Sequence, residues 1–157
     1  EEARKKVVGE EALLDSYHRA RKIVVVFPHV GPINELVALV AALGIHAYVP
    51  AEAIPPLLFR LMAGSRNRHG NIEFEPIRKG KMMERCRAEL EAGRVVVLAM
   101  DMPPGKKSLG NVLHVGQAET DVRVGAVKLA IEEEADLFMA FPYWNRENPE
   151  VLIEKLN

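Results

Sequence analysis

One histidine stands where a fully apolar stretch gives way to a helical pattern. The run from Ile23 to Phe27 is continuously apolar and mostly β-branched, which predicts a strand buried on both faces. His29 follows this run, and Asn34 and Glu35 fall in the first turn of the helix predicted after it. A nearby carboxylate can orient a histidine as a general base. We therefore expect His29 to be a base oriented by Glu35. The alternatives are that His29 is a turn or core residue and that Glu35 complements the helix N-terminus.

Charged residues also follow the second fully apolar stretch, Val95 to Met100. Asp101 comes directly after this stretch, and Lys106 and Lys107 lie in the polar loop that continues from it. Because ligands bind at the carboxyl ends of parallel strands, we expect this loop to share one crevice with His29 if the two strands are neighbours. A basic loop that contains Arg66 and Arg68 would close the side of this crevice. Such a set suits acyl transfer to a hydroxyl, in which cations stabilise the oxyanion or hold phosphate. The alternative is that Lys106, Lys107, Arg66 and Arg68 are solvated loop residues without a role in a site.

Apolar patterns of strand and helix type alternate along the whole chain. This alternation predicts an α/β fold with a mainly parallel central sheet flanked by helices. Helices are expected at residues 9–21, from about 33 to Gly44, after Pro55-Pro56, and at 79–92 and 121–134; strands at 23–27, 45–49, 72–77, 95–100, 112–116, 137–143 and 151–154. We expect Val124, Val127 and Ile131 to face inward from the last helix. Pro76 places its strand near an edge.

Length and composition indicate one globular domain spanning residues 1–157. The chain has 21 basic and 22 acidic residues and a net charge of -1, so nothing global favours nucleic acid as a partner. A single cysteine, Cys86, excludes an intrachain disulfide and a cysteine-based zinc site, and its helical spacing favours a buried core thiol. The remaining histidines lack metal-ligand spacing, so no metal site is expected. No apolar run approaches the ~20 residues of a spanning helix.

The order of these segments resembles the lysophospholipid acyltransferase superfamily, and most closely the late lipid A and phosphatidylinositol mannoside acyltransferases. The resemblance begins with Val8 to Leu13 and the stretch from Ile23 to Gly31, and includes the arginine-rich segment Arg66 to Gly70. It continues through the helix, glycine, strand and aspartate of Arg87 to Asp101 and the closing stretch from Val115 to Ala130. Together these pieces span roughly Val8 to Tyr143.

The resemblance implies a glycerol-phosphate acyltransferase-like fold and an O-acyltransferase. Its donor would be an acyl thioester on acyl carrier protein or coenzyme A, a co-substrate rather than a bound cofactor, and its acceptor a lipid or glycolipid hydroxyl. By position, His29 would be the base. Asn34 stands where the family has its acid, so either Glu35, one residue later, or the Asn34 side-chain oxygen would orient the ring. Of the other implied site residues, Arg66 or Arg68 would serve the oxyanion or a phosphate, and Asp101 would support the site. Lys106, Lys107 or Arg78 would face an anionic headgroup.

Two other functions stay open at this point. One is a catalytically inactive acyltransferase-like domain that binds lipid or a partner, motivated by the displaced acid. The other is a hydrolase that passes the acyl group to water, for which no Gly-x-Ser-x-Gly motif is present. We expect a cytoplasmic protein with peripheral contact at the inner face of the membrane, either compact or a piece of a longer chain. The candidate contact surface is the apolar segment Ile54, Leu57, Leu58, Phe59, Leu61 and Met62, whose alternative is the buried face of an ordinary helix.

Overall fold

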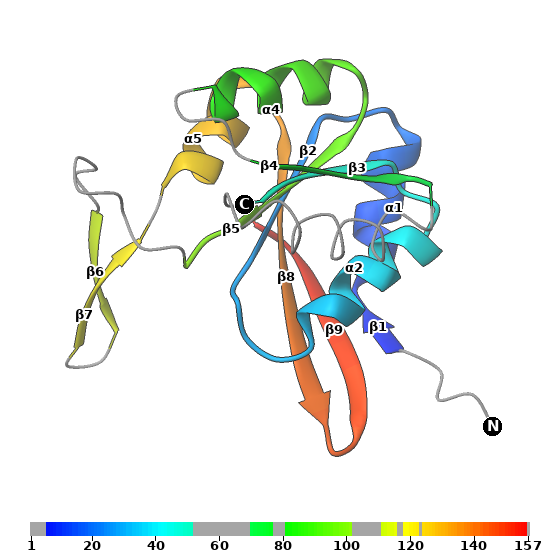
Figure 1. The fold of residues 1–157 in the computed structure, drawn as a ribbon, viewed down its shortest axis with the longest axis vertical. Coiled ribbons are helices and arrows are strands. Elements are labelled where there is room, and N and C mark those ends of the chain that lie inside the picture. The colour runs from blue at the N-terminus through cyan, green and yellow to red at the C-terminus, as the bar shows by residue number, and fades with distance from the viewer. Residues whose placement is uncertain are drawn as a thin grey trace.

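A computed structural model describes residues 6–51, 70–76, 81–101, 111–115, 118–122 and 124–156. At its centre is a seven-stranded sheet in the order β1-β9-β8-β2-β5-β3-β4 (Figure 1). Its strands are β1 Lys6–Val8, β2 Ile23–Phe27, β3 Ala47–Ala51, β4 Ile72–Pro76, β5 Val95–Ala99, β8 Asp136–Asn145 and β9 Asn148–Leu156. Neighbouring strands of this sheet are parallel except β8 and β9, which form an antiparallel hairpin. The predicted α/β fold with a mainly parallel sheet is confirmed.

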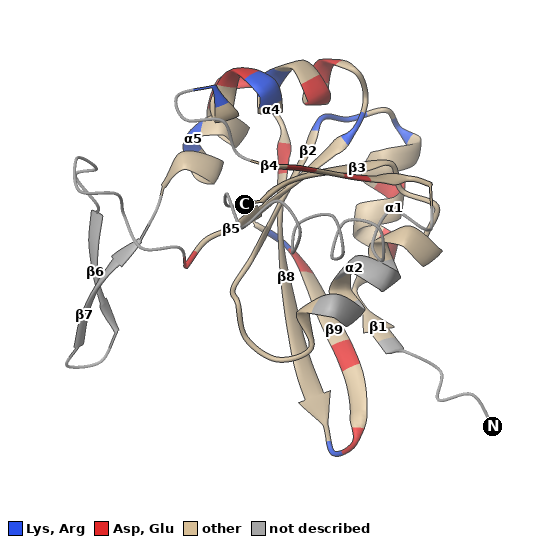
Figure 2. Cartoon of the chain, viewed as in Figure 1, with Lys and Arg blue, Asp and Glu red and all other residues tan. Residues whose placement is uncertain are grey.

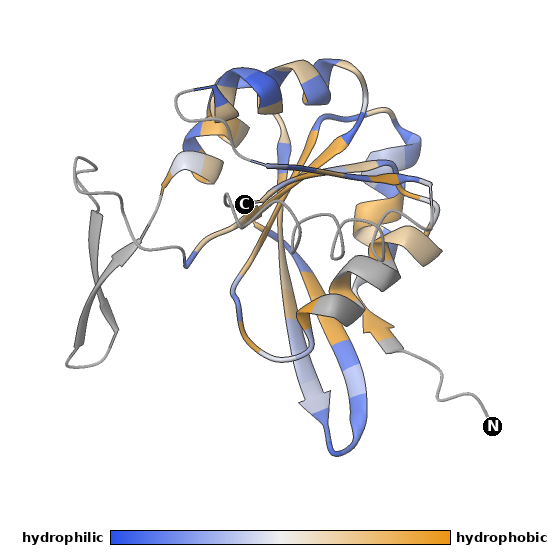
Figure 3. Cartoon of the chain, viewed as in Figure 1, coloured by the Kyte–Doolittle hydropathy of each residue, from blue (hydrophilic) through white to orange (hydrophobic). Residues whose placement is uncertain are grey.

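Helices pack on both faces of this sheet. The helices α1 (Glu10–His18) and α2 (Ile33–Ala42) cover one face, while α4 (Met82–Glu91) and α5 (Gly125–Glu132) cover the other. Every residue of β2 is buried, because alternate side chains enter the two cores. Figure 3 shows the most hydrophobic residues concentrated in these central strands, and Figure 2 shows many of the charged ones on α4. Burial of a β-branched run on both sides explains its lack of polar alternation.

Two carboxylates, one buried and one partly buried, are held by ion pairs and hydrogen bonds. Glu89 on α4 is buried and pairs with Arg85 at 2.8 Å and Arg94 at 2.7 Å. Asp136, at the start of β8, accepts a hydrogen bond from the Ser16 hydroxyl on α1 at 2.8 Å and pairs with Lys155 at 3.1 Å. Burial raises the pKa of Asp136, but these partners outweigh it and hold the pKa below its usual value. Both carboxylates are therefore compensated and structural.

Several predicted elements are confirmed, with modest shifts at their ends. The strand at 23–27 is β2, and β5 ends one residue before the predicted Met100. The strand that contains Pro76 is at the edge of the sheet, as its sequence indicates. Cys86 is buried, as the helical pattern predicts. The expected helix after Pro55-Pro56 and the loop around Arg66 and Arg68 lie outside the described residues.

Two predictions about the last helix are wrong. Asp121 and Val122 belong to a strand, β7 (Ala118–Val122), which pairs with β6 (Asn111–Val115) in a separate two-stranded sheet, and α5 begins only at Gly125. The predicted inward face of α5 is also reversed: Val124, Val127 and Ile131 are exposed. The residues that α5 buries against the sheet are Ala126, Leu129 and Ala130. Small alanines let a helix approach the sheet closely, and counting only large apolar residues overlooks them.

The predicted strand at 151–154 is confirmed as part of β9, which is longer at both ends and forms a long hairpin with β8. β8 and β9 pair from Leu137 and Leu156 to Asn145 and Asn148, around a turn at Arg146 and Glu147. This turn contains no glycine, and Arg146 itself takes a positive φ of 58°, so the usual sequence signal is missing. β1, also not predicted, pairs with β9.

Candidate active site

The site begins where β2 and β5 end side by side. These strands are parallel neighbours, with Phe27 opposite Ala99, and the Met100 N–H donates to the Phe27 carbonyl at 3.0 Å. His29 and Asp101 each come two residues after this last pair. The condition stated for a shared crevice, that these two strands are neighbours, is met, and it brings their polar ends together at the carboxyl edge of the sheet.

His29 and Asp101 make two hydrogen bonds. The ring Nδ1 of His29 lies 2.7 Å from Asp101 Oδ1, and the backbone N–H of His29 donates to Asp101 Oδ2 at 2.6 Å. Each carboxylate oxygen therefore accepts from a different donor on the same residue. An ionised carboxylate can only accept, so it favours the tautomer with the proton on Nδ1 and leaves Nε2 as the basic nitrogen.

The charge of Asp101 is stabilised by these contacts. Burial raises the pKa of Asp101, but the hydrogen bonds from the His29 ring and backbone outweigh it, so the net pKa lies below the usual value. Asp101 is therefore ionised at neutral pH. The His29 and Asp101 side chains are 43% and 37% exposed, so a substrate can reach the pair.

The loop after β2 is held in place by contacts on two sides. The His29 ring lies against Phe27, with centroids 5.4 Å apart. Gly31 has a φ of 63°, and a Cβ placed on it would lie 2.4 Å from the Pro142 carbonyl oxygen of β8. Only glycine tolerates both this backbone conformation and this approach. Gly31 thus lets the His29 loop pack directly against β8.

The other predicted site residues are not brought to His29 by any described contact. Asn34 and Glu35 lie in α2. The structure describes the backbone of this helix at both positions, but these two side chains lie outside the described part. Arg66, Arg68, Arg78, Lys106 and Lys107 lie outside the described residues. Their roles remain predictions.

The partner that the structure gives His29 is a different acid from the one expected. Sequence spacing favours Glu35, only six residues away, whereas Asp101 is 72 residues away along the chain. The signal for Asp101 was its place directly after an apolar strand, but nothing local indicated that it meets the imidazole.

Comparison with known proteins adds no family to this geometry. No protein-family model matches the chain, and no curated protein matches it. The described residues include no helix long and apolar enough to cross a membrane. Nor does the described part of the chain gather three His, Cys, Asp or Glu side chains that could hold a metal ion.

Proposed function

We propose that this protein is an O-acyltransferase. It moves a fatty acyl group from an acyl thioester, carried by acyl carrier protein or coenzyme A, to a hydroxyl of a lipid or glycolipid. One contact carries the proposal: His29 Nδ1 lies 2.7 Å from Asp101 Oδ1 at the carboxyl ends of two neighbouring central strands. The resemblance in segment order to the lysophospholipid acyltransferases supports the reaction type.

In the proposed reaction, His29 acts on the acceptor hydroxyl. Nε2 removes the hydroxyl proton as the oxygen attacks the thioester carbonyl, and a tetrahedral oxyanion forms. Asp101 holds the Nδ1 proton and stabilises the imidazolium. The carbon–sulfur bond then breaks, the thiolate leaves, and the proton on Nε2 passes to it. The products are the ester and the free thiol.

A covalent acyl-enzyme on cysteine is disfavoured by the structure. Cys86 is the chain's one cysteine. It is buried on α4, and burial first and the charge of Glu89 second raise the pKa of its thiol to about 11. A thiol with this pKa is almost wholly protonated at neutral pH and is a poor nucleophile. Direct transfer to the acceptor therefore fits the described residues better than a two-step route.

The rest of the proposal comes from the resemblance. Arg66 or Arg68 would bind the oxyanion or a phosphate, and Lys106, Lys107 or Arg78 would face an anionic headgroup. A glycerol-phosphate acyltransferase-like fold and a cytoplasmic protein with peripheral contact at the inner face of the membrane belong to the same proposal.

The test is a thiol-release assay with acyl-coenzyme A and acyl carrier protein thioesters, each offered with a panel of lipid and glycolipid alcohols. Thiol appearance and ester formation are measured together, because equal amounts distinguish transfer from hydrolysis. His29→Ala should abolish both and leave the melting temperature near that of the wild type. The matched control is His18→Ala, which removes an exposed histidine of α1 and should retain activity. Undiminished turnover by His29→Ala would refute the assignment, and thioester binding without turnover by the wild type would indicate an inactive binding domain.

A further inference from the structure

The hydrogen bond to Asp101 fixes one atom of the His29 ring, but it does not fix the direction of the ring. Nδ1 of His29 lies 2.7 Å from Asp101 Oδ1, and this is the one hydrogen bond that the described residues give to the ring. The His29 side chain is 43% exposed. A ring that is tethered at one atom and open to solvent can turn about that tether, and such a turn moves Nε2 away from a bound hydroxyl. A second contact is therefore needed to hold Nε2 in place.

The ring of Phe27 supplies this second contact. The centroids of the Phe27 and His29 rings are 5.4 Å apart, and the two ring planes are inclined by 59°. Tilted aromatic pairs with centroids about 4.5–7 Å apart attract each other, so the contact favours one inclination of the imidazole. Phe27 is itself buried in the core on the α1 and α2 face. The imidazole thus rests against a ring that the core holds still.

Strand register explains why these two rings meet. Phe27 lies opposite Ala99, and both side chains pack into the same core. His29 and Asp101 each come two residues after this pair, and the two-residue period of an extended chain directs them to the same side. Each polar residue of the site therefore follows an apolar residue of the core. Because Ala99 is small, no bulky side chain at this position of β5 competes with the imidazole for the Phe27 ring.

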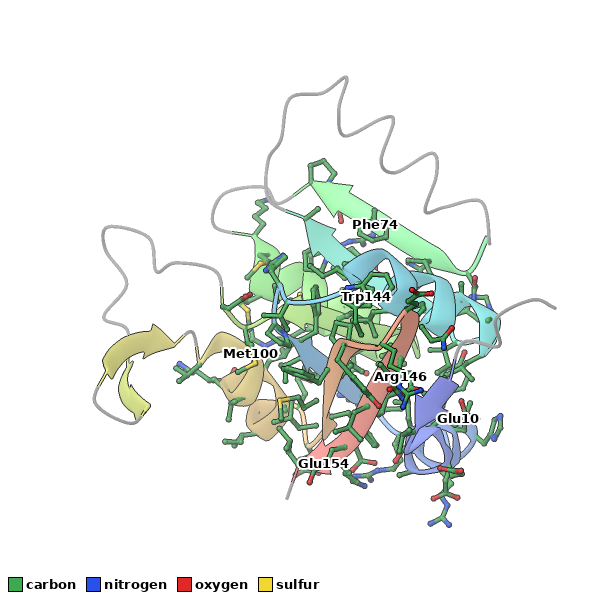
Figure 4. The ribbon with its side chains drawn as sticks, turned by 90° about the horizontal axis from the view of Figure 1, so that it is seen from below. Glu10, Phe74, Met100, Trp144, Arg146 and Glu154 are labelled. Carbon is green, nitrogen blue, oxygen red and sulfur yellow. The ribbon has the colours of Figure 1, made fainter. Side chains whose placement is uncertain are left out.

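The backbone that joins the two rings is short and stiff. Only Pro28 separates Phe27 from His29, and a proline fixes its own φ and restricts the residue before it. The Phe27 carbonyl also accepts a hydrogen bond from the Met100 N–H at 3.0 Å. Figure 4 labels Met100, which follows the last residue of β5. A change in the relative position of the rings would therefore have to come from the His29 side chain itself.

Proton transfer makes strict demands on the position of Nε2. A general base must come within about 2.6–3.2 Å of the hydroxyl oxygen, and a misplacement of about 1 Å can lower a rate on the order of 100-fold. Among the described residues, only the Asp101 carboxylate and the Phe27 ring contact the imidazole through a hydrogen bond or a ring contact. The two contacts restrain different motions of the same ring.

We propose that Phe27 is a positioning residue for the base: its ring fixes the direction of Nε2, whereas Asp101 fixes which nitrogen carries the proton. This inference rests on the proposed acyltransferase function and assigns a further residue to it. Phe27 is buried and acts only through His29. Without its ring, a smaller fraction of imidazole orientations presents Nε2 to the hydroxyl, so kcat falls. KM for either substrate stays the same, because no substrate contact is lost.

The experiment removes the Phe27 ring and keeps its apolar bulk. Phe27→Leu should lower kcat for thiol release about five- to tenfold, within the range that one aromatic contact supports. KM for the thioester and for the acceptor should stay within twofold. Because Asp101 is intact, ¹⁵N NMR should still show the proton on Nδ1. Phe27→Tyr retains a ring beside His29 and should keep kcat within twofold, since any cost of its hydroxyl appears in unfolding and not in kcat.

Phe138→Leu is the matched control for a merely structural effect. Phe138 is fully buried in the same core as Phe27, on the neighbouring strand β8, and its described contacts do not include the His29 ring. Its replacement should lower the melting temperature at least as much as Phe27→Leu does, and it should leave kcat within twofold. An equal loss of kcat in the two variants would overturn the inference.

Relaxation of the ¹³C–¹H groups of the His29 ring gives a second readout that needs no turnover. The order parameter of the ring should fall in Phe27→Leu and not in Phe138→Leu. An unchanged order parameter, or an unchanged kcat in Phe27→Leu, would overturn the inference. If the wild type transfers no acyl group to any acceptor, the proposed reaction is refuted, and relaxation alone then judges the role of Phe27. A fall confined to Phe27→Leu upholds that role, and no fall overturns it.

Discussion

Replacing Asp101 with asparagine tests the proposed chemistry at one atom. In the native structure, Oδ2 accepts the His29 backbone N–H at 2.6 Å and Oδ1 faces ring Nδ1 at 2.7 Å. An asparagine has one acceptor oxygen and one NH2 group. The His29 backbone N–H can only donate, so it keeps its hydrogen bond to the side-chain oxygen of the new asparagine. The NH2 group of the asparagine is then left facing Nδ1 of His29. The imidazole must then carry its proton on Nε2, where it cannot accept another from a substrate.

The expected loss is large because the tautomer is wrong while the shape is preserved. The corresponding change in a Ser-His-Asp hydrolase lowers kcat about 10⁴-fold. Because the His29–Asp101 pair is partly exposed, we expect Asp101→Asn to lower kcat by about 10³- to 10⁴-fold. This loss corresponds to about 4 to 5.5 kcal/mol of transition-state stabilisation. Substrate KM should change little. Stability should change by no more than about 1 kcal/mol, because both side chains are partly in solvent.

Steady-state thiol release measures kcat and KM, and ¹⁵N NMR of the His29 ring reports the tautomer directly. The native ring should show a protonated Nδ1, and Asp101→Asn should move the proton to Nε2. Asp15→Asn, which removes an exposed carboxylate of α1 that pairs with Arg19, is the matched control. A native-like kcat in Asp101→Asn, or an unchanged tautomer, would refute the reasoning.

Four further outcomes follow from the described contacts. Glu35→Gln should lower kcat less than tenfold, because Nδ1 already has its partner; a loss as large as that of Asp101→Asn in the same assay would restore Glu35 as the orienting acid. Gly31→Ala should cost about 1–3 kcal/mol in urea unfolding and reduce kcat, because its Cβ would strike β8; unchanged values would show that the loop has room to move. Cys86→Ala should keep full activity at a cost of about 1 kcal/mol, and in the folded wild type the buried thiol should react with iodoacetamide far more slowly than after unfolding. Asp136→Asn should be less stable than the wild type at neutral pH. Because the folded pKa of Asp136 is depressed, this difference should shrink as the pH falls below about 3.8, and a difference independent of pH would contradict the role of its charge.

The fold was predictable where a short stretch of sequence allows only one interpretation. The β-branched runs of β2 and β5 cannot be solvated, so they become central strands whatever surrounds them. The alternation of elements then favours a parallel sheet. The hairpin of β8 and β9 was not predictable in this way, because its turn residue Arg146 adopts a positive φ without being glycine. The orientation of α5 was mispredicted because two of the three residues that it buries, Ala126 and Ala130, are small and give a weak hydrophobic signal.

The sequence predicted where the site lies, but not which acid contacts His29. Position directly after a buried strand identifies both His29 and Asp101, and this rule needs no knowledge of the fold. Which acid meets the imidazole depends on strand order, and the order joins segments 72 residues apart. Glu35 comes one residue after the position where the resembled family has its acid, and one residue on a helix turns a side chain by about 100°. The spacing alone therefore could not show whether Glu35 faces His29.

The parallel pairing of β1 with β9 has a consequence for how the molecule is made. Val7 lies beside Val151, so the strand that precedes all others of this sheet in the sequence pairs with the strand that follows them all. Such distant contacts are slow to form because a long loop must close first. On the ribosome, β1 has to wait until β9 has emerged and turned back along β8. Folding of the nascent chain should therefore finish with this edge, after the central strands are already in place.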